Sequence, residues 1–203
     1  MKQVLLSTAY FPPVYYFSKI IQSNETIIEI EENFNKQTYR NRCVILGANG
    51  PLNLTVPVLH SEQKIPIKNL YISYQSNWQL IHKRAIESAY RNSPFYEYYI
   101  DDFSRFFQEK PDKLIDYNNQ ILNVCLEIVG YRGILKFSDD YVEQAENDFR
   151  YIITPKKALE KVVFPVYHQV FIDKFGFISN LSILDLIFNC GPETKDILVQ
   201  INR

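Results

Sequence analysis

Residues 3–31 read QVLLSTAYFPPVYYFSKIIQSNETIIEIE, and they set the architecture of this chain. Gln3–Ser7 is an apolar run of strand length, and the prolines that follow end it. Because proline suits the first turn of a helix, we expect a helix from Pro13 to about Asn24. Thr26–Glu31 has the pattern of a second strand. A strand, a helix and a strand in so short a stretch predict a βαβ unit with parallel strands.

An antiparallel section follows this unit. Arg42–Leu46 and Leu52–Val58 are predicted strands, and they flank Gly47–Gly50, which contains an Asn-Gly pair. Asn-Gly between apolar runs favours a tight hairpin, because both residues tolerate a positive φ. Three further short strands are predicted later in the chain: Ile67–Ser73, Ile134–Ser138 and Val166–Phe171.

The second half of the chain is mainly helical by its apolar periodicity. Asp139–Lys161 is polar and contains a proline, so we expect a long, partly helical excursion there. These patterns predict one α/β domain over residues 1–203. Its mixed central sheet begins as a parallel βαβ unit, continues as an antiparallel hairpin and is covered by helices. The predicted helices begin at or near Ser76, Ser93-Pro94, Asp112, Ser182 and Pro192.

The composition narrows the class of protein. The net charge is −1 and Lys and Arg form no dense run, so a nucleic-acid partner is not expected. No segment approaches the ~20 apolar residues of a membrane span, and the first apolar run is too short for a signal peptide. We therefore expect a cytoplasmic protein. Most of the 15 Tyr and 14 Phe are expected to fill the core, and Cys43, Cys125 and Cys190 are expected to be free buried thiols.

Residues 76–90, SNWQLIHKRAIESAY, are predicted to form an amphipathic helix, with Ser76 and Gln79 as a capping box. His82 and the only tryptophan fall on its apolar face. A buried imidazole needs a hydrogen-bond partner and can have a shifted pKa. Two interpretations of His82 stay open: a general base poised near neutral pH, or a core histidine bonded to a tyrosine or a backbone carbonyl. Tyr90 lies at the boundary of this helix, within reach of a groove.

Two arginines flank Asn41 just before a predicted strand. In an extended chain Arg40 and Arg42 point to the same side, where two guanidinium groups match the geometry of a phosphate or a carboxylate. The alternative is a solvated strand end with surface ion pairs. The motif is therefore a candidate anion clamp.

The remaining polar motifs favour structural roles. His60 is expected in a polar loop, and either His168 or the pair of residues around it must face away from the core. No histidine pair has metal-ligand spacing, so no metal is expected. No cofactor is predicted either. Ser182-x-x-Asp185 is interpreted as a capping box. The sequence contains no nucleophile elbow and no glycine-rich phosphate loop.

Five segments together resemble the WbqC-like family, and they span nearly the whole chain. They are LSTAYFPPVYYFSKI at 6–20, ENFNKQTYRNRCVI at 32–45, Leu54–Val58, Trp78-x3-His82-x3-Ile86-x3-Tyr90, and QVFIDKFGFISNLSILDLIFNCGPE at 169–193. Typical members end their first strand in His-Gln-Pro, where this chain has Ser7-Thr8-Ala9.

The resemblance implies a link to the synthesis of O-antigen and other surface polysaccharides, which the family has mainly through gene context. It also draws attention to the residues at the family's motif positions. In this chain they are Arg40, Asn41, Arg42, Thr55, Trp78, His82, Tyr90, Ser182 and Asp185.

The leading hypothesis is a cytoplasmic transferase that modifies a sugar precursor of surface glycan, by acyl or aminoacyl transfer to an amino sugar. In this hypothesis His82 is the base and Arg40 and Arg42 hold an anionic group. The other predicted substrate contacts are Tyr10, Asn41, Thr55, Tyr90 and Asp185.

The ligand is expected beyond the carboxyl ends of the parallel strands, near Ser7–Tyr10 and Glu32. An alternative stays open, in which the protein is a non-catalytic binding or assembly partner of glycan-synthesis enzymes. That alternative predicts a large aromatic patch on the surface and an inert, buried His82.

Overall fold

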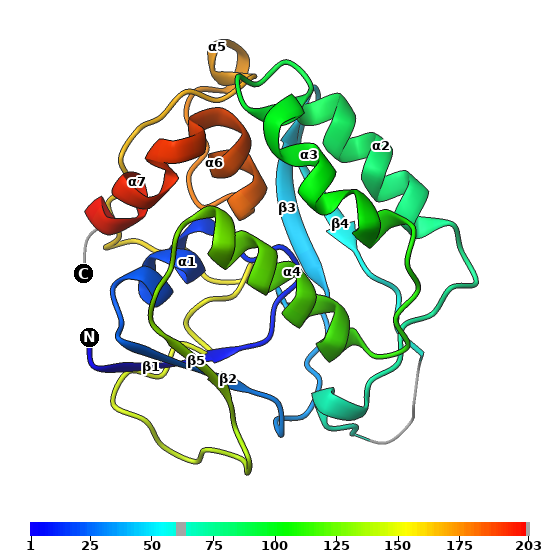
Figure 1. Ribbon diagram of the computed structural model, residues 1–203, viewed down its shortest axis with the longest axis vertical. Helices are drawn as coiled ribbons and strands as arrows, with labels where there is room; N and C mark the ends of the chain where they lie inside the picture. Colours follow the sequence, from blue (N-terminus) through cyan, green and yellow to red (C-terminus); the bar gives the residue numbers. More distant parts are fainter. Residues whose placement is uncertain (60–63, 202–203) are drawn as a thin grey trace.

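The computed structural model describes residues 1–59 and 64–201, so His60 lies outside the described residues. The fold is mixed α/β, as predicted. Figure 1 shows a three-stranded parallel sheet near the N-terminus of the chain and a separate two-stranded hairpin. The strands are therefore divided between two sheets, in place of the single mixed sheet that we expected.

The predicted βαβ unit is confirmed. β1 (Gln3–Ser7) and β2 (Glu25–Glu29) pair in parallel, and β5 (Ile134–Phe137) pairs in parallel with β2, which gives the order β1-β2-β5. The register sets Ser7 beside Glu29. The carboxyl ends of β1 and β2 therefore meet at the same edge of the sheet, where ligands of open α/β sheets bind.

β3 (Arg42–Gly47) and β4 (Gly50–Thr55) form the predicted antiparallel hairpin. The two glycines that flank its turn pair with each other, and Gly50 has a φ of 107°, which glycine adopts without strain. At the other end of the ladder Arg42 lies opposite Thr55. The hairpin therefore brings these two side chains side by side.

The second half is helical, as predicted, and both α2 and α6 pack on β3 (Figure 1). The helices are α1 (Val14–Ile21), α2 (Trp78–Tyr90), α3 (Tyr96–Ser104), α4 (Leu114–Ile128), α5 (Ile172–Phe175), α6 (Ile183–Cys190) and α7 (Thr194–Gln200). Three 3₁₀ turns accompany them: Ile67–Asn69, Arg105–Phe107 and Gly191–Glu193.

The predicted strand Ile67–Ser73 is wrong. It begins as the 3₁₀ turn Ile67–Asn69, after Pro66, and continues only into isolated bridges at Tyr71 and Ile72. Its apolar side chains reach the core from a turn, so burial without a ladder accounts for the strand-like pattern.

The predicted strand Val166–Phe171 is also wrong, because this segment joins no sheet. Its side chains nevertheless alternate as an extended chain requires: Tyr167 and Gln169 are buried and His168 is exposed. The pattern identified the inward-facing residues correctly, but it could not show whether a neighbouring strand was present.

Asp139–Lys161 contains no helix, so the partly helical prediction is wrong. Part of this segment lies along β1 instead. The Leu5 amide donates to the Asn147 carbonyl at 3.0 Å, and the Phe149 amide donates to the Leu5 carbonyl at 2.9 Å. These bonds bring Arg150 to the carboxyl end of the sheet.

Helix capping follows the sequence only in part. Ser182 caps α6, since its hydroxyl accepts from the Leu184 amide at 3.3 Å. The predicted capping box on α2 is wrong, because the Gln79 side chain donates to the carbonyls of Phe106 and Glu109 at 2.9 and 2.6 Å. The helix predicted to begin near Asp112 is α4, and Asp112 does not cap it: α4 begins after Lys113 without a side-chain cap.

The core is rich in aromatic residues, as expected. Its largest fully buried side chains include Tyr10, Tyr90 and Tyr117, and α2 turns Trp78 and His82 inward as its periodicity predicts. The three cysteines are buried with free thiols. Within residues 1–59 and 64–201, the helices are all too short or too polar to cross a bilayer.

Candidate functional site

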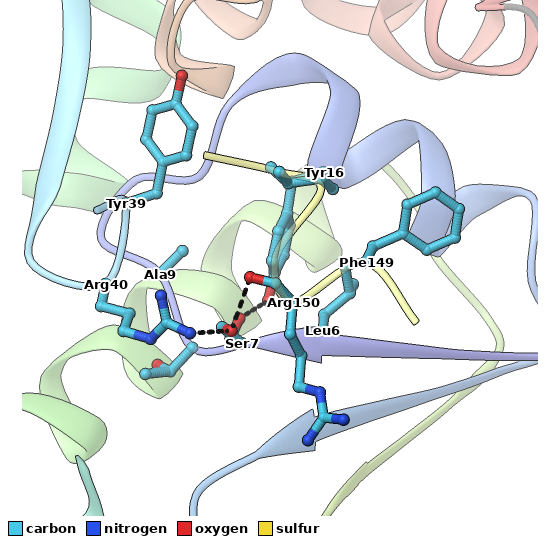
Figure 2. Close-up of a pocket in the computed structure, with 10 residues that line it drawn as sticks. Leu6, Ser7, Ala9, Tyr16, Tyr39, Arg40, Phe149 and Arg150 are labelled. Carbon is cyan, nitrogen blue, oxygen red and sulfur yellow. Dashed lines mark hydrogen bonds between the residues drawn. The ribbon is translucent and has the colours of Figure 1, made fainter. Parts of the chain in front are cut away.

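A buried ion pair lies at the carboxyl end of β1. Arg40 donates to both Glu32 carboxylate oxygens, through Nε at 2.9 Å and Nη2 at 2.5 Å. The same Nη2 donates to Ser7 Oγ at 2.8 Å, and Tyr16 donates to the Ser7 carbonyl at 2.9 Å. Figure 2 shows the Arg40 and Tyr16 side chains reaching Ser7. The fork of Arg40 thus faces a buried carboxylate of the protein itself.

A second buried ion pair lies beside the first. Arg150 Nη1 contacts Glu29 Oε2 at 3.1 Å, and its Nε and Nη2 donate to the two Asp148 oxygens at 3.0 and 2.7 Å. Glu29 also accepts from the Ser138 hydroxyl at 2.7 Å and from two backbone amides. Every charge in this network has a partner, as buried ions require.

The cavity between these groups is too small for a substrate. Ser7, Arg40, Tyr16 and Phe149 are among the residues that enclose it (Figure 2), and its volume is about 10 Å³. That volume is comparable to the space that one water molecule needs. The ion pairs at the carboxyl ends of β1 and β2 therefore hold the surrounding segments together. A ligand would have to bind in one of the larger cavities nearby.

His82 is a buried residue in an aromatic surround. It is 4% exposed, and its Nδ1 is hydrogen bonded to the Tyr10 hydroxyl at 2.9 Å. Trp78 packs edge-on against the ring at 5.1 Å between centroids. The backbone of Thr55 also lies close enough to the ring to interact with it. The tyrosine and backbone partners are those of the core-histidine interpretation, and the role of His82 as a base stays a prediction.

The surroundings of His82 shift its titration. Burial lowers the pKa of His82 from 6.5 to about 4, and the interaction with the Thr55 backbone opposes this shift only in part. The ring is therefore neutral at pH 7. A neutral imidazole between a tyrosine and a backbone group holds both in place without a buried charge.

We expect this histidine to make the fold sensitive to acid. Between pH 6.5 and 4 the unfolded chain binds a proton that the folded chain does not. Above pH 6.5 His82 therefore does not lower the free energy of unfolding. As the pH falls from 6.5 toward 4, this residue lowers the free energy of unfolding by about 1.4 kcal/mol per pH unit. Urea denaturation at pH 7, 6 and 5 measures this slope. In the His82→Asn variant the slope should be smaller by that amount, and equal slopes in the two proteins would contradict the assignment.

Asp185 is turned into the core, so it does not complete a capping box. The Tyr167 hydroxyl and the Gln169 amide donate to its Oδ2 at 2.7 and 2.8 Å. Burial raises the pKa of Asp185 to about 6, although these hydrogen bonds lower it. Tyr90 is also buried, and the charge of Asp185 adds to the burial that raises the pKa of its hydroxyl. The cluster fixes the segment before α6, and substrate roles for Asp185 and Tyr90 stay predictions.

An open groove of about 250 Å³ lies at the end of the hairpin opposite its turn, where Arg42 and Thr55 pair. Arg42 Nε donates to Thr55 Oγ1 at 3.2 Å across the ladder. Asn41 is locked to Val56 by two bonds of 2.8 Å, one from its side chain and one to its backbone carbonyl. Phe34, Pro57 and Val58 give the groove apolar walls, and Lys36 and Gln37 complete its lining.

The structure brings some of the predicted site residues together and separates others. Asn41, Arg42 and Thr55 share the groove. His82 and Tyr10 lie next to the groove, since His82 interacts with the backbone of Thr55 and is hydrogen bonded to Tyr10. The remaining predicted contacts lie apart from the groove: Arg40 beside Glu32, and Tyr90 with Asp185 under α6.

Sequence reasoning missed the second ion pair. The sequence predicts Glu29 in a strand and Arg150 in a long, partly helical excursion. The two residues are 121 positions apart, and neither belongs to a recognisable motif. An acidic residue at the end of an apolar strand was the one available signal, since a buried carboxylate at that place requires a cation.

The fold and the groove define an α/β protein with a cationic recess beside a hairpin. The WbqC-like protein family matches residues 8–162, so the chain belongs to this family. The chain is also similar to the uncharacterized protein Rv1507c of Mycobacterium tuberculosis. The two are 26% identical over 230 aligned positions, which cover 98% of each chain. No solved structure matches the chain.

Proposed function

We propose that this WbqC-like protein is a cytoplasmic transferase that acts on an anionic, sugar-derived precursor of surface polysaccharide such as O-antigen. The groove beside the hairpin supports this proposal most strongly. It combines residues from two of the family-like segments, Asn41 and Arg42 from one and Thr55 from the other, in one recess. The link to surface polysaccharide rests on the family resemblance.

The charge of the groove favours an anion. Among residues 1–59 and 64–201, its lining includes the cations Lys36 and Arg42 and no carboxylate. Within the described part of the chain, the two Nη atoms of Arg42 make no hydrogen bond or ion pair, while Nε is held by Thr55. A guanidinium fixed at one nitrogen and free at the other two is suited to a phosphate or a carboxylate.

The groove is supported from the interior. His82 interacts with the backbone of Thr55, and Tyr10 is hydrogen bonded to His82. In this proposal the two residues position Thr55, and Thr55 in turn orients Arg42. Rigid support of this kind is what a binding group needs to hold a ligand in one geometry.

We expect the substitution Arg42→Ala to weaken binding of UDP-N-acetylglucosamine by about ten- to a hundredfold, since hydrogen bonds to charged groups contribute about 1.5–3 kcal/mol. Isothermal titration calorimetry at low salt measures the dissociation constants. Arg91→Ala is the matched control, because Arg91 is exposed at the end of α2 and does not line the groove. Equal affinity in wild type and Arg42→Ala would contradict the proposed anion site.

Transfer itself is tested by mass spectrometry. Wild-type protein is incubated with acetyl-coenzyme A and an amino-sugar phosphate, and the sugar is examined for the mass of an added acetyl group. Product that forms with wild type and falls sharply with Arg42→Ala supports the transferase. Tight binding without any product would favour the alternative, a binding partner of glycan-synthesis enzymes.

A further inference from the structure

A second, larger pocket adjoins the groove. Its volume is about 540 Å³, within the range of small-molecule sites. Phe34 lines both the pocket and the groove, so the two spaces meet at this side chain. The remaining lining residues are Glu31, Glu32, Asn33, Asn35, Lys64, Tyr141 and Tyr151.

Two tyrosines form one wall of this pocket. Tyr141 and Tyr151 are each about half exposed, at 47% and 50%, and their side chains lie close enough to interact. The Arg150 guanidinium lies 5.1 Å from the Tyr141 ring centre and 5.7 Å from that of Tyr151. Arg150 is itself held by Glu29 and Asp148. The aromatic wall is therefore fixed from behind by the buried ion network.

Other residues that line the pocket supply hydrogen-bonding groups. Glu32 is buried and its carboxylate is fixed by Arg40. A carboxylate has about four acceptor positions, and Arg40 occupies one on each oxygen, so Glu32 retains acceptor capacity. Asn33 and Asn35 add amide donors and acceptors, and Glu31 adds a second carboxylate, paired with Lys68 at 2.6 Å.

We propose that this pocket binds a pyranose sugar, with its apolar face on Tyr151 and Tyr141 and its hydroxyl or amino groups toward Glu32. A pyranose has an apolar C–H face and a polar rim, and the pocket offers an aromatic wall and a polar wall to match. The carboxylates favour an amino substituent over a second anion. The inference deepens the proposed function and rests on it, because it names the sugar part of the substrate and places it beside the anion groove.

The test uses uncharged and cationic sugars that do not need the groove. Methyl glucoside and glucosamine are titrated into wild-type, Tyr151→Ala and Tyr98→Ala proteins, and binding is followed by saturation-transfer NMR. Tyr98 is the matched control, since it is 77% exposed on α3 and does not line the pocket. We expect wild type to bind both sugars, Tyr151→Ala to bind at least tenfold more weakly, and Tyr98→Ala to bind like wild type.

Two results would overturn the inference: no binding of either sugar to folded wild-type protein, or undiminished binding to Tyr151→Ala. The Arg42→Ala variant separates this inference from the proposed function. Sugar binding should persist in Arg42→Ala, because the groove is not involved. If wild type binds UDP-N-acetylglucosamine but neither simple sugar, the proposed sugar pocket is wrong and the anion groove stands. If wild type binds the simple sugars but no phosphate-bearing ligand, the proposed anion groove is wrong and the sugar pocket stands.

Discussion

Replacing Arg150 by methionine is expected to lower the free energy of unfolding by about 3–5 kcal/mol, because one partner of a buried ion pair is removed. Arg150 is 3% exposed and contacts both Glu29, which is fully buried, and Asp148. The methionine fills part of the volume but leaves the Glu29 charge without its cation. Urea denaturation at pH 7 measures the loss.

Arg91→Met is the control for this experiment, and surface substitutions of this kind change stability by about 0.5 kcal/mol or less. The Arg150→Met variant should also bind sugar more weakly, since Tyr141 and Tyr151 lose the group that supports their rings. A loss of stability below about 1 kcal/mol would show that the ion network does not hold this edge of the sheet.

The second large effect is expected at Arg40. The Arg40→Met substitution leaves the buried Glu32 carboxylate unpaired and breaks the bond to Ser7, so we expect a loss of about 3–5 kcal/mol. Arg40→Lys should recover only part of it, because an ammonium cannot make the two-pronged contact with Glu32. Urea denaturation again provides the measurement.

A double variant tests the cause of that loss. Arg40→Met combined with Glu32→Gln should be less destabilised than Arg40→Met alone, because the neutral amide removes the unpaired charge. If the two losses simply added, the effect at Arg40 would come from packing instead of from the stranded carboxylate.

The elements that the sequence predicted well have strong local signals. The alternation of apolar strand, proline turn and helix in residues 3–31 specified the βαβ unit, and Asn-Gly specified the hairpin. The failures at Ile67–Ser73 and Val166–Phe171 have one physical reason. Both segments bury apolar or aromatic side chains without pairing to a strand, and a burial pattern does not reveal whether a ladder exists.

The candidate site was predictable only where its residues are close in the chain or paired by the hairpin. Arg42 and Thr55 lie opposite each other because the turn sets the register, and Asn41 is adjacent. The support from His82 and the packing of the aromatic wall on Arg150 depend on contacts between segments far apart in the sequence. Tyr10 and His82, for example, are 72 positions apart. Local patterns carry no information about such contacts, so the sugar pocket could not be foreseen.

The most direct measurement of the central claim uses one ligand with both chemical parts. Glucosamine 1-phosphate is titrated by calorimetry into wild type, Arg42→Ala, Tyr151→Ala and the double variant. We predict that each single substitution weakens binding by about tenfold or more and that the two effects multiply in the double variant, since the phosphate and the sugar ring occupy separate spaces. Binding that neither substitution changes, or no binding to wild type, would contradict a substrate site that extends on both sides of Phe34.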